Sequence, residues 1–381
     1  MLRARMGLSG RVRAFTAALV VALVGLTAIA ASASALPVRF WGVVPQAIPS
    51  EEQFTRLQVG GVKTMRVPFD WGGLQHGGKT TPINFEGIDA IVERAAKHNV
   101  EVLPYLTGAP NWAVPSVFVP GDNKAKAPAH LPAAGAAATS WSKFVKEAVA
   151  RYGSTGSFWA THPAVPKKPI KVWQIWNEPN FKYFVAKPNP AEYGRLVKLS
   201  STAIKSADPS GQLLLAGMFA FPKGCLKEKK PKSPCADDFL DQMYKKTPGV
   251  KTKFQWVALH PYTDKYQELT TSIEAFRNTL IKHKDAGKGL WITELGWSSK
   301  PVNRATNIFA KGEAGQATQL KGAFTLLRNR ATKWKLQRVY WFSVDDSIGT
   351  CNFCDGSGLF GDGFVPKKSW YEYVKFAGGT P

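Results

Sequence analysis

The sequence predicts a (β/α)8 barrel, a single α/β domain of eight parallel strands with helices between them. Eight short apolar runs, rich in β-branched and aromatic residues, are typical of fully buried strands. Stretches with apolar residues at helical spacing alternate with them between residues 36 and 381. No glycine-rich phosphate loop follows the first run, which weakens the competing prediction of a doubly wound open sheet.

The expected strands and helices follow one another along the whole domain. The strands are expected at residues 38–44, 63–68, 100–106, 171–176, 212–218, 254–259, 289–293 and 338–342. Helical spacing is clearest at residues 88–95, 141–149, 193–204 and 324–327. Two longer intervals are expected to be irregular: a Pro/Ala-rich loop at 108–138, which should overhang the active-site face, and a loop at 221–237.

Composition favours a globular protein. The chain has 381 residues, of which 44% are hydrophobic and 12% aromatic. Its 13 tryptophans fit carbohydrate binding, since Trp faces stack on sugar rings, and they fit a Trp-rich core equally well.

The first 35 residues have the pattern of a secretory signal peptide. Four arginines precede an uncharged run that ends in Ala-Ser-Ala-Ser-Ala, with cleavage expected after Ala35. The alternative is an uncleaved membrane anchor, because the apolar run is just long enough to span a bilayer if tilted. We therefore expect a secreted protein whose folded domain covers residues 36–381.

Cysteine usage agrees with export. The four cysteines form two close pairs, Cys225 with Cys235 and Cys351 with Cys354, and such spacing outside the cytoplasm indicates disulfides. Zinc is the alternative for the second pair, but the nearby sequence offers no further Cys or His ligand. We expect no metal and no cofactor.

The formal net charge is +23, which falls to +19 without the four arginines of residues 1–35. Such a charge attracts polyanions or an anionic cell surface, although much of it lies in runs typical of solvated loops. No nucleic-acid motif accompanies it. The expected partner is a poly- or oligosaccharide, with anionic ones among the candidates; the oligomeric state is not predicted.

Two glutamates directly follow apolar strands. Glu178 comes after the fourth expected strand and Glu294 after the seventh, and aromatic residues flank both. In a barrel, the C-terminal strand ends meet at one mouth, so the two carboxyl groups should face each other there. Glycoside hydrolysis needs such a pair, one to protonate the leaving oxygen and one to attack the sugar or activate water.

The two motifs resemble clan A of the glycoside hydrolases, family 39 first and family 5 second. They are Trp-Asn-Glu-Pro-Asn at residues 176–180 and Thr-Glu-Leu-Gly-Trp at residues 293–297. The resemblance extends over roughly residues 38–376. It implies a retaining glycosidase with Glu178 as general acid/base and Glu294 as nucleophile, their carboxyl groups about 5–5.5 Å apart.

Further roles follow from the resemblance. Arg66, at the end of the second strand, and Tyr262 would hold Glu294 ionised by hydrogen bonds. Asn177 would bind the 2-hydroxyl of the sugar, and Trp341, at the end of the eighth strand, would form the floor of the subsite beside the bond being cut. His260, at the end of the sixth strand, would lie beside the nucleophile. Arg66 could instead form a structural salt bridge, and His260 could be a satisfied core residue.

Trp112 and Trp297 complete the expected substrate-binding residues, with core or rim positions as their alternative. The competing functions are a catalytically inactive carbohydrate-binding protein on the same barrel and a basic cell-surface protein whose partner is an anionic polymer. The intact glutamates and Asn177 argue against an inactive site, because such a site has no reason to keep them. The sequence leaves the sugar, the linkage and endo or exo action open.

Overall fold

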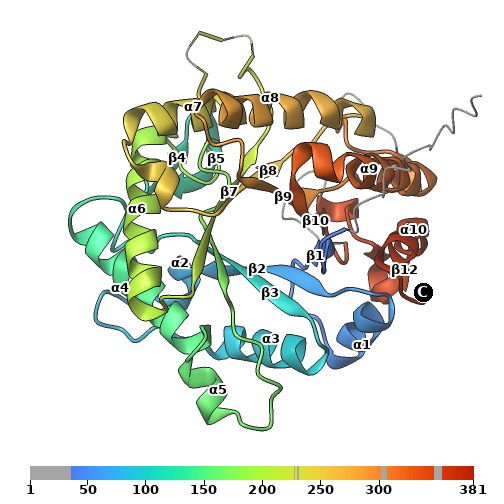
Figure 1. Cartoon of the computed structure of the whole chain (residues 1–381), viewed down its shortest axis with the longest axis horizontal. Helices are drawn as coiled ribbons and strands as arrows, with labels where there is room; N and C mark the ends of the chain where they lie inside the picture. The colour runs from blue at the N-terminus through green and yellow to red at the C-terminus, as the bar shows by residue number, and fades with distance from the viewer. Residues whose placement is uncertain (1–35, 227, 230, 302–306, 347–353) are drawn as a thin grey trace, which may run out of the picture. The chain divides into compact units, whose positions relative to one another are not determined.

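The computed structural model describes residues 36–226, 228–229, 231–301, 307–346 and 354–381. Residues 36–381 form one compact unit. Eight parallel strands close into a barrel in the order β1-β10-β9-β8-β7-β6-β3-β2, with helices around it (Figure 1). The predicted (β/α)8 barrel is confirmed. The predicted signal segment, residues 1–35, lies outside the described residues and stays a prediction.

The barrel strands coincide with the eight apolar runs to within three residues at each end. They are β1 Trp41–Val44, β2 Thr64–Asp70, β3 Glu101–Thr107, β6 Val172–Ile175, β7 Gln212–Phe219, β8 Trp256–His260, β9 Gly289–Leu295 and β10 Leu336–Phe342. Strands β1 and β10 pair with Trp41 opposite Val339, which closes the barrel.

Helices follow the strands and cover the outside of the barrel (Figure 1). The longer ones are α1 Glu51–Val59, α3 Glu86–Lys97, α4 Gly135–Tyr152, α6 Pro190–Ala207, α7 Ala236–Lys246, α8 Leu269–Lys282, α9 Gly312–Trp334 and α10 Lys368–Ala377. Short helices are α2 Trp71–Leu74 and α5 Ser157–Thr161, with 3-10 turns η1 Val250–Thr252, η2 Tyr266–Glu268, η3 Cys354–Gly356 and η4 Asp362–Phe364. In the part of the chain that the structure describes, no helix is long and apolar enough to span a membrane.

The core has two layers because successive residues of a strand point to opposite faces. Between the barrel and its helices lies a large cluster that includes Trp173, Ile292 and Trp341. A smaller cluster fills the barrel interior and includes Trp291, Tyr340 and Phe342.

A β-hairpin interrupts the loop that the sequence analysis expected to be irregular. Strands β4 (Ser116–Val119) and β5 (Asp122–Pro128) pair antiparallel within residues 108–138. A small apolar contact between Val119, Ala127 and Ala186 attaches the hairpin to the segment that follows Glu178. A second, two-residue hairpin pairs β11 (Phe360–Gly361) with β12 (Val365–Pro366).

The predicted disulfide between Cys225 and Cys235 is confirmed, in the loop between β7 and α7. This loop supports the segment after Glu178, since the side chain of Asn180 donates to the carbonyl oxygens of Phe219 and Pro234. The other predicted pairing includes Cys351, which lies outside the described residues, and it stays a prediction.

We expect the Cys225–Cys235 bridge to stabilise the fold modestly, because it closes a loop with a sequence separation of only 10. Replacing both cysteines by serine should lower the free energy of unfolding by at most about 3 kcal/mol. Urea denaturation of the double variant beside the parent measures this. A loss well above that value would mean that the bridge does more than restrict the unfolded chain.

Candidate active site

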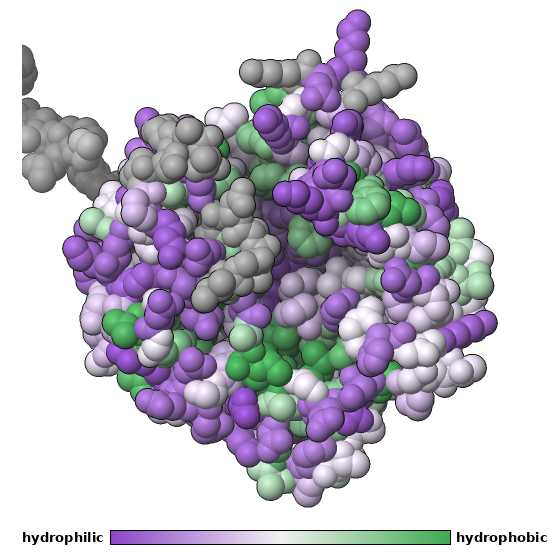
Figure 2. Space-filling model, turned by 180° about the vertical axis from the view of Figure 1, so that it is seen from behind, coloured by the Kyte–Doolittle hydropathy of each residue, from purple (hydrophilic) through white to green (hydrophobic). Residues whose placement is uncertain are grey.

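A cavity of about 280 Å³ opens where the barrel strands end. Asn177, Glu178, Tyr262 and Glu294 line it together with several phenylalanines. The face of the molecule seen in Figure 2 is hollowed near its centre, and hydrophobic residues border the hollow. Polar groups converging in an apolar cavity are typical of a small-molecule site.

Arg66 of β2 lies fully buried beneath the cavity and organises it. Its Nε donates to Gln174, one terminal nitrogen to Glu294 and the other to Asn177, each at 2.6 Å. The guanidinium also stacks over the ring of Tyr105, 3.8 Å from the ring centroid. Arg66 therefore forms a salt bridge with Glu294 and also links Glu294 to Gln174 and Asn177.

The backbone that carries Glu178 has an unusual conformation. Trp176 and Glu178 have φ angles of 72° and 41°, a left-handed region that non-glycine residues rarely occupy. The N–H of Glu178 donates to the carbonyl of Gly217 on β7 at 3.1 Å, which helps to hold this turn. Strain of this kind concentrates at functional sites.

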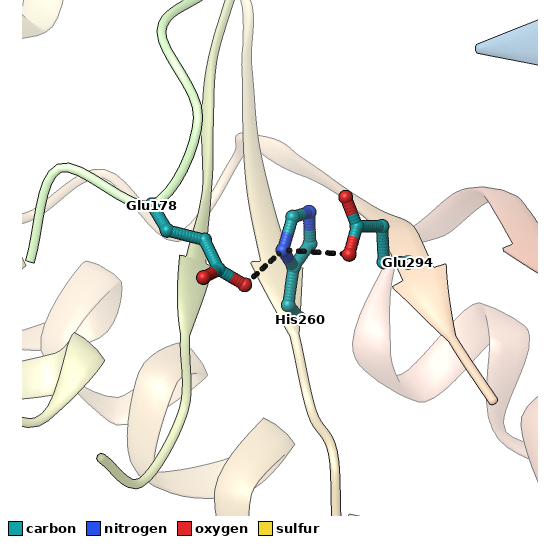
Figure 3. Close-up of side chains that lie close together, drawn as sticks. All are labelled: Glu178, His260 and Glu294. Atoms are coloured by element: carbon teal, nitrogen blue, oxygen red, sulfur yellow. Dashed lines mark hydrogen bonds and ion pairs between the residues drawn. The ribbon is translucent and has the colours of Figure 1, made fainter. Parts of the chain in front are cut away.

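His260, at the end of β8, lies between the two glutamates (Figure 3). Its Nδ1 is 2.7 Å from Oε1 of Glu178 and 3.5 Å from Oε2 of Glu294. The hydroxyl of Tyr262 donates to this same oxygen, Oε2 of Glu294, at 2.8 Å, while Arg66 holds the other oxygen, Oε1. One oxygen of Glu178 and one of Glu294 lie within 4.8 Å of each other.

The two carboxyl groups differ in their electrostatic environment. Burial raises the pKa of Glu178 well above its ordinary value, and the charge of Glu294 raises it further. Burial also raises the pKa of Glu294, but Arg66 and Tyr262 oppose this by charge and hydrogen bonds. Burial lowers the pKa of His260 well below its ordinary value, so its ring is uncharged. Glu178 therefore keeps a proton more readily than Glu294 does.

Glu178, His260 and Glu294 are also the described residues that come close enough together to hold a metal ion. One Glu294 oxygen already pairs with Arg66, whose positive charge opposes a second cation nearby. The expectation that the protein needs no metal or cofactor stays a prediction.

Three tryptophans predicted to bind substrate do not line this cavity. Trp341 is fully buried on the helix side of β10, where it contacts Phe324 and donates to the carbonyl of Ser357. Trp297 is also fully buried and donates to the carbonyls of Thr263 and Asp264. Trp112 lines a separate pocket.

Several residues that the sequence analysis did not single out belong to the site. Phe342, the neighbour of Trp341, lines the cavity because alternate residues of β10 face the barrel interior. Phe181, Phe184 and Phe219 line it as well. Gln174 and Thr293 could have been found in the sequence, because each is a polar residue inside an otherwise apolar strand. A buried polar side chain in such a position requires a hydrogen-bonding partner.

A (β/α)8 barrel with two differently held glutamates at the C-terminal ends of its strands is the architecture of a glycoside hydrolase of the barrel type. The sequence comparison agrees, because residues 137–363, more than half of the chain, match the glycosyl hydrolase catalytic core family. The chain belongs to this family.

The individual proteins that this chain resembles have low sequence identity to it. A β-xylosidase of Geobacillus stearothermophilus is 28% identical over 149 residues, which cover 35% of this chain and 28% of that protein. A family 39 glycoside hydrolase of Bacteroides cellulosilyticus superposes with a TM-score of 0.60 at 18% identity, over 90% of this chain and 64% of its own. A monomeric β-xylosidase of Caulobacter crescentus gives a TM-score of 0.57 at 17% identity, over 89% of this chain and 68% of its own. The first two matches span less than two thirds of the relative's length, and the structural matches show a shared fold.

The raised pKa of Glu178 has a consequence for stability. The folded protein keeps this proton at pH values where the unfolded chain has lost it, so stability falls as pH rises above the ordinary pKa of a glutamate. Glu178→Gln should therefore raise the free energy of unfolding near pH 7.5 by on the order of 1 kcal/mol, and by less near pH 4.

Thermal unfolding at several pH values measures this effect, with exposed Glu52→Gln as the matched control. A Glu178→Gln variant that is no more stable than the parent at pH 7.5 would mean that the buried carboxyl group is ionised at no cost.

Proposed function

We propose that this protein is a retaining glycoside hydrolase in which Glu178 is the general acid/base and Glu294 the nucleophile. The observation that carries the proposal is the pair of buried carboxyl groups, with oxygens within 4.8 Å of each other at the ends of two strands. A separation of about 5–5.5 Å is typical of retaining enzymes, whereas inverting ones leave roughly 6.5–9.5 Å for a water molecule.

The reaction has two displacements. Glu294 attacks the anomeric carbon while Glu178 gives its proton to the leaving oxygen, so that the glycosidic bond breaks and a glycosyl ester of Glu294 forms. Glu178 then takes a proton from water, which attacks the same carbon and releases Glu294. Burial keeps Glu178 protonated for the first step, and Arg66 and Tyr262 keep Glu294 ionised. Asn177, fixed by Arg66, is placed to bind the sugar 2-hydroxyl.

The walls of the cavity support a proposal for the substrate class. Among the described residues that line it, none is a lysine or an arginine, and phenylalanines are prominent. We therefore propose that an uncharged sugar unit binds beside the glutamates and packs against aromatic rings. The β-xylosidases among the relatives are consistent with a neutral sugar. The net charge of +23 would act at the surface of the protein.

We also propose that the protein is exported. The basic start and apolar run of residues 1–35 support this, as does the disulfide between Cys225 and Cys235, since such bonds persist in oxidising compartments.

The roles of the two glutamates can be tested without reference to any relative. Glu178→Ala should still form the glycosyl ester with an activated aryl glycoside, because that leaving group needs no proton. Added azide should then speed turnover and give a product of unchanged anomeric configuration. Glu294→Ala should be inactive towards the same substrate, and azide should give the inverted product if any.

Kinetics with and without azide, together with NMR of the products, check both variants. The opposite stereochemistry would exchange the two roles. A parent protein without activity on a broad glycoside panel, and no rescue of either variant, would favour a carbohydrate-binding protein instead.

Phe342 and Trp341 provide a matched pair on opposite faces of one strand. We expect Phe342→Ala to lower kcat/KM by about tenfold or more, through the loss of an apolar wall worth roughly 1.5–3 kcal/mol. Trp341→Phe should mainly lower the melting temperature, because it removes a buried hydrogen bond on the helix side. Steady-state kinetics and thermal unfolding of both variants check this, and a larger kinetic effect of Trp341→Phe would place the substrate platform at Trp341 after all.

A further inference from the structure

A chain of hydrogen bonds runs from Arg66 through Gln174 and Thr293 to His260, and the chemistry of its donors and acceptors determines which group donates at each step. Nε of Arg66 can only donate, so the side-chain oxygen of Gln174 must face it, at 2.6 Å. The amide nitrogen of Gln174 then points the other way, where it donates to the carbonyl of Leu215 at 3.0 Å and to the hydroxyl of Thr293 at 3.2 Å. Both amide hydrogens are used, and the side chain has no second orientation that satisfies these partners.

The hydroxyl of Thr293 links Gln174 to His260, so the orientation of the Gln174 amide determines which way the hydrogen bond between Thr293 and His260 points. It accepts from Gln174 and lies 2.9 Å from Nε2 of His260. If Nε2 carried a proton, the Thr293 oxygen would receive two hydrogens, and its own would have no acceptor among the residues that the structure describes. If Thr293 donates to Nε2 instead, the side-chain groups of Gln174, Thr293 and His260 are all satisfied, as buried polar groups normally are.

The geometry around His260 leaves little freedom for another arrangement. A Cβ atom at Gly217 would lie 1.9 Å from Nε2 of His260 and 2.4 Å from Oγ1 of Thr293. The imidazole and the hydroxyl are thus packed directly against the bare backbone of β7. Because the buried ring is uncharged and accepts at Nε2, its single proton is on Nδ1.

We infer that Gln174 and Thr293 are positioning residues that hold His260 in the Nδ1–H tautomer, so that its proton is donated to Glu178 and faces Glu294. The tautomer is inferred from the contacts of Gln174 and Thr293 with an uncharged ring, and Nδ1 lies 2.7 Å and 3.5 Å from the two carboxyl groups. Its catalytic consequence rests on the proposed glycosidase function. The same tautomer leaves Nδ1 without a lone pair for a metal ion.

The consequence concerns the proton of Glu178, which must leave and return in each turnover. A donor aimed at Glu178 stabilises the carboxylate that remains after proton transfer. The charged groups that face Glu178 are Glu294, which opposes ionisation, and Arg66, which favours it. Tyr105 and Tyr262 face it as well and stay neutral, because burial raises the pKa of Tyr105 to about 12 and that of Tyr262 well above its ordinary value. Donation by His260 therefore keeps Glu178 a usable acid despite its burial.

The tautomer can be observed directly in the full chain. In protein labelled with ¹⁵N-histidine, long-range ¹H–¹⁵N spectra distinguish the protonated ring nitrogen from the unprotonated one. His260→Gln identifies the His260 signals among those of the six histidines. We expect the Nδ1–H form in the parent and in Thr293→Ser, which keeps the hydroxyl. In Thr293→Val, which lacks it, the two nitrogen shifts should move toward each other as both tautomers become populated.

The kinetic measurement uses the same two variants. In Thr293→Val the imidazole can accept a hydrogen bond from protonated Glu178, so the basic limb of the pH profile of kcat/KM should move up by about one pH unit, a tenfold change in the ionisation constant. Thr293→Ser should keep the parent profile, which separates loss of the hydroxyl from a general disturbance of packing.

A parent protein with an Nε2–H or doubly protonated His260 overturns the inference, as does a Thr293→Val variant that matches Thr293→Ser in both measurements. If the parent hydrolyses no glycoside, the proposed function fails, while the spectra still decide the tautomer.

Discussion

The burial of one guanidinium group is the constraint on which the rest of the site depends. A cation in a barrel interior costs several kcal/mol unless its hydrogen bonds are satisfied. Arg66 meets this cost with Gln174, Asn177 and Glu294, which come from β6, from the segment after it and from β9. A lysine has three donors on a single nitrogen, so it could not reach partners that lie in the three directions of the planar guanidinium. The same side chain therefore links three strands of the barrel and holds the site residues in place.

The barrel could be predicted from the sequence because strands buried on both faces leave continuous apolar runs. The hairpin of β4 and β5 could not. Its second strand, Asp122–Pro128, carries exposed lysines and small residues, so it has neither an apolar run nor a regular alternation. Its attachment combines a small apolar contact with hydrogen bonds from Lys182, Tyr183 and Ala186, and such contacts leave no pattern in a sequence.

The glutamates could be predicted because a charged residue directly after a buried strand needs a partner or a role. The aromatic residue of β10 that lines the cavity could not be predicted in the same way. Tyr340, Trp341 and Phe342 are three consecutive aromatic residues, so the sequence does not indicate which of them face the barrel interior. The register of β10 with β1 and β9 decides this, and it puts Trp341 against the helices and Phe342 at the cavity.

The hairpin of β4 and β5 can change in sequence and length independently of the barrel and its buried hydrogen-bond network. It projects from the connection between β3 and α4 and shares no side chain with the network of Arg66, Gln174, Thr293 and His260. Insertions or deletions at its tip can accumulate without altering the barrel, as surface loops generally permit. The hairpin also packs against the segment that follows Glu178, and Phe181 and Phe184 of that segment line the cavity, so a change in the hairpin can act on the cavity wall through this segment. A barrel of this kind can thus vary the wall of its cavity while its two buried glutamates stay in place.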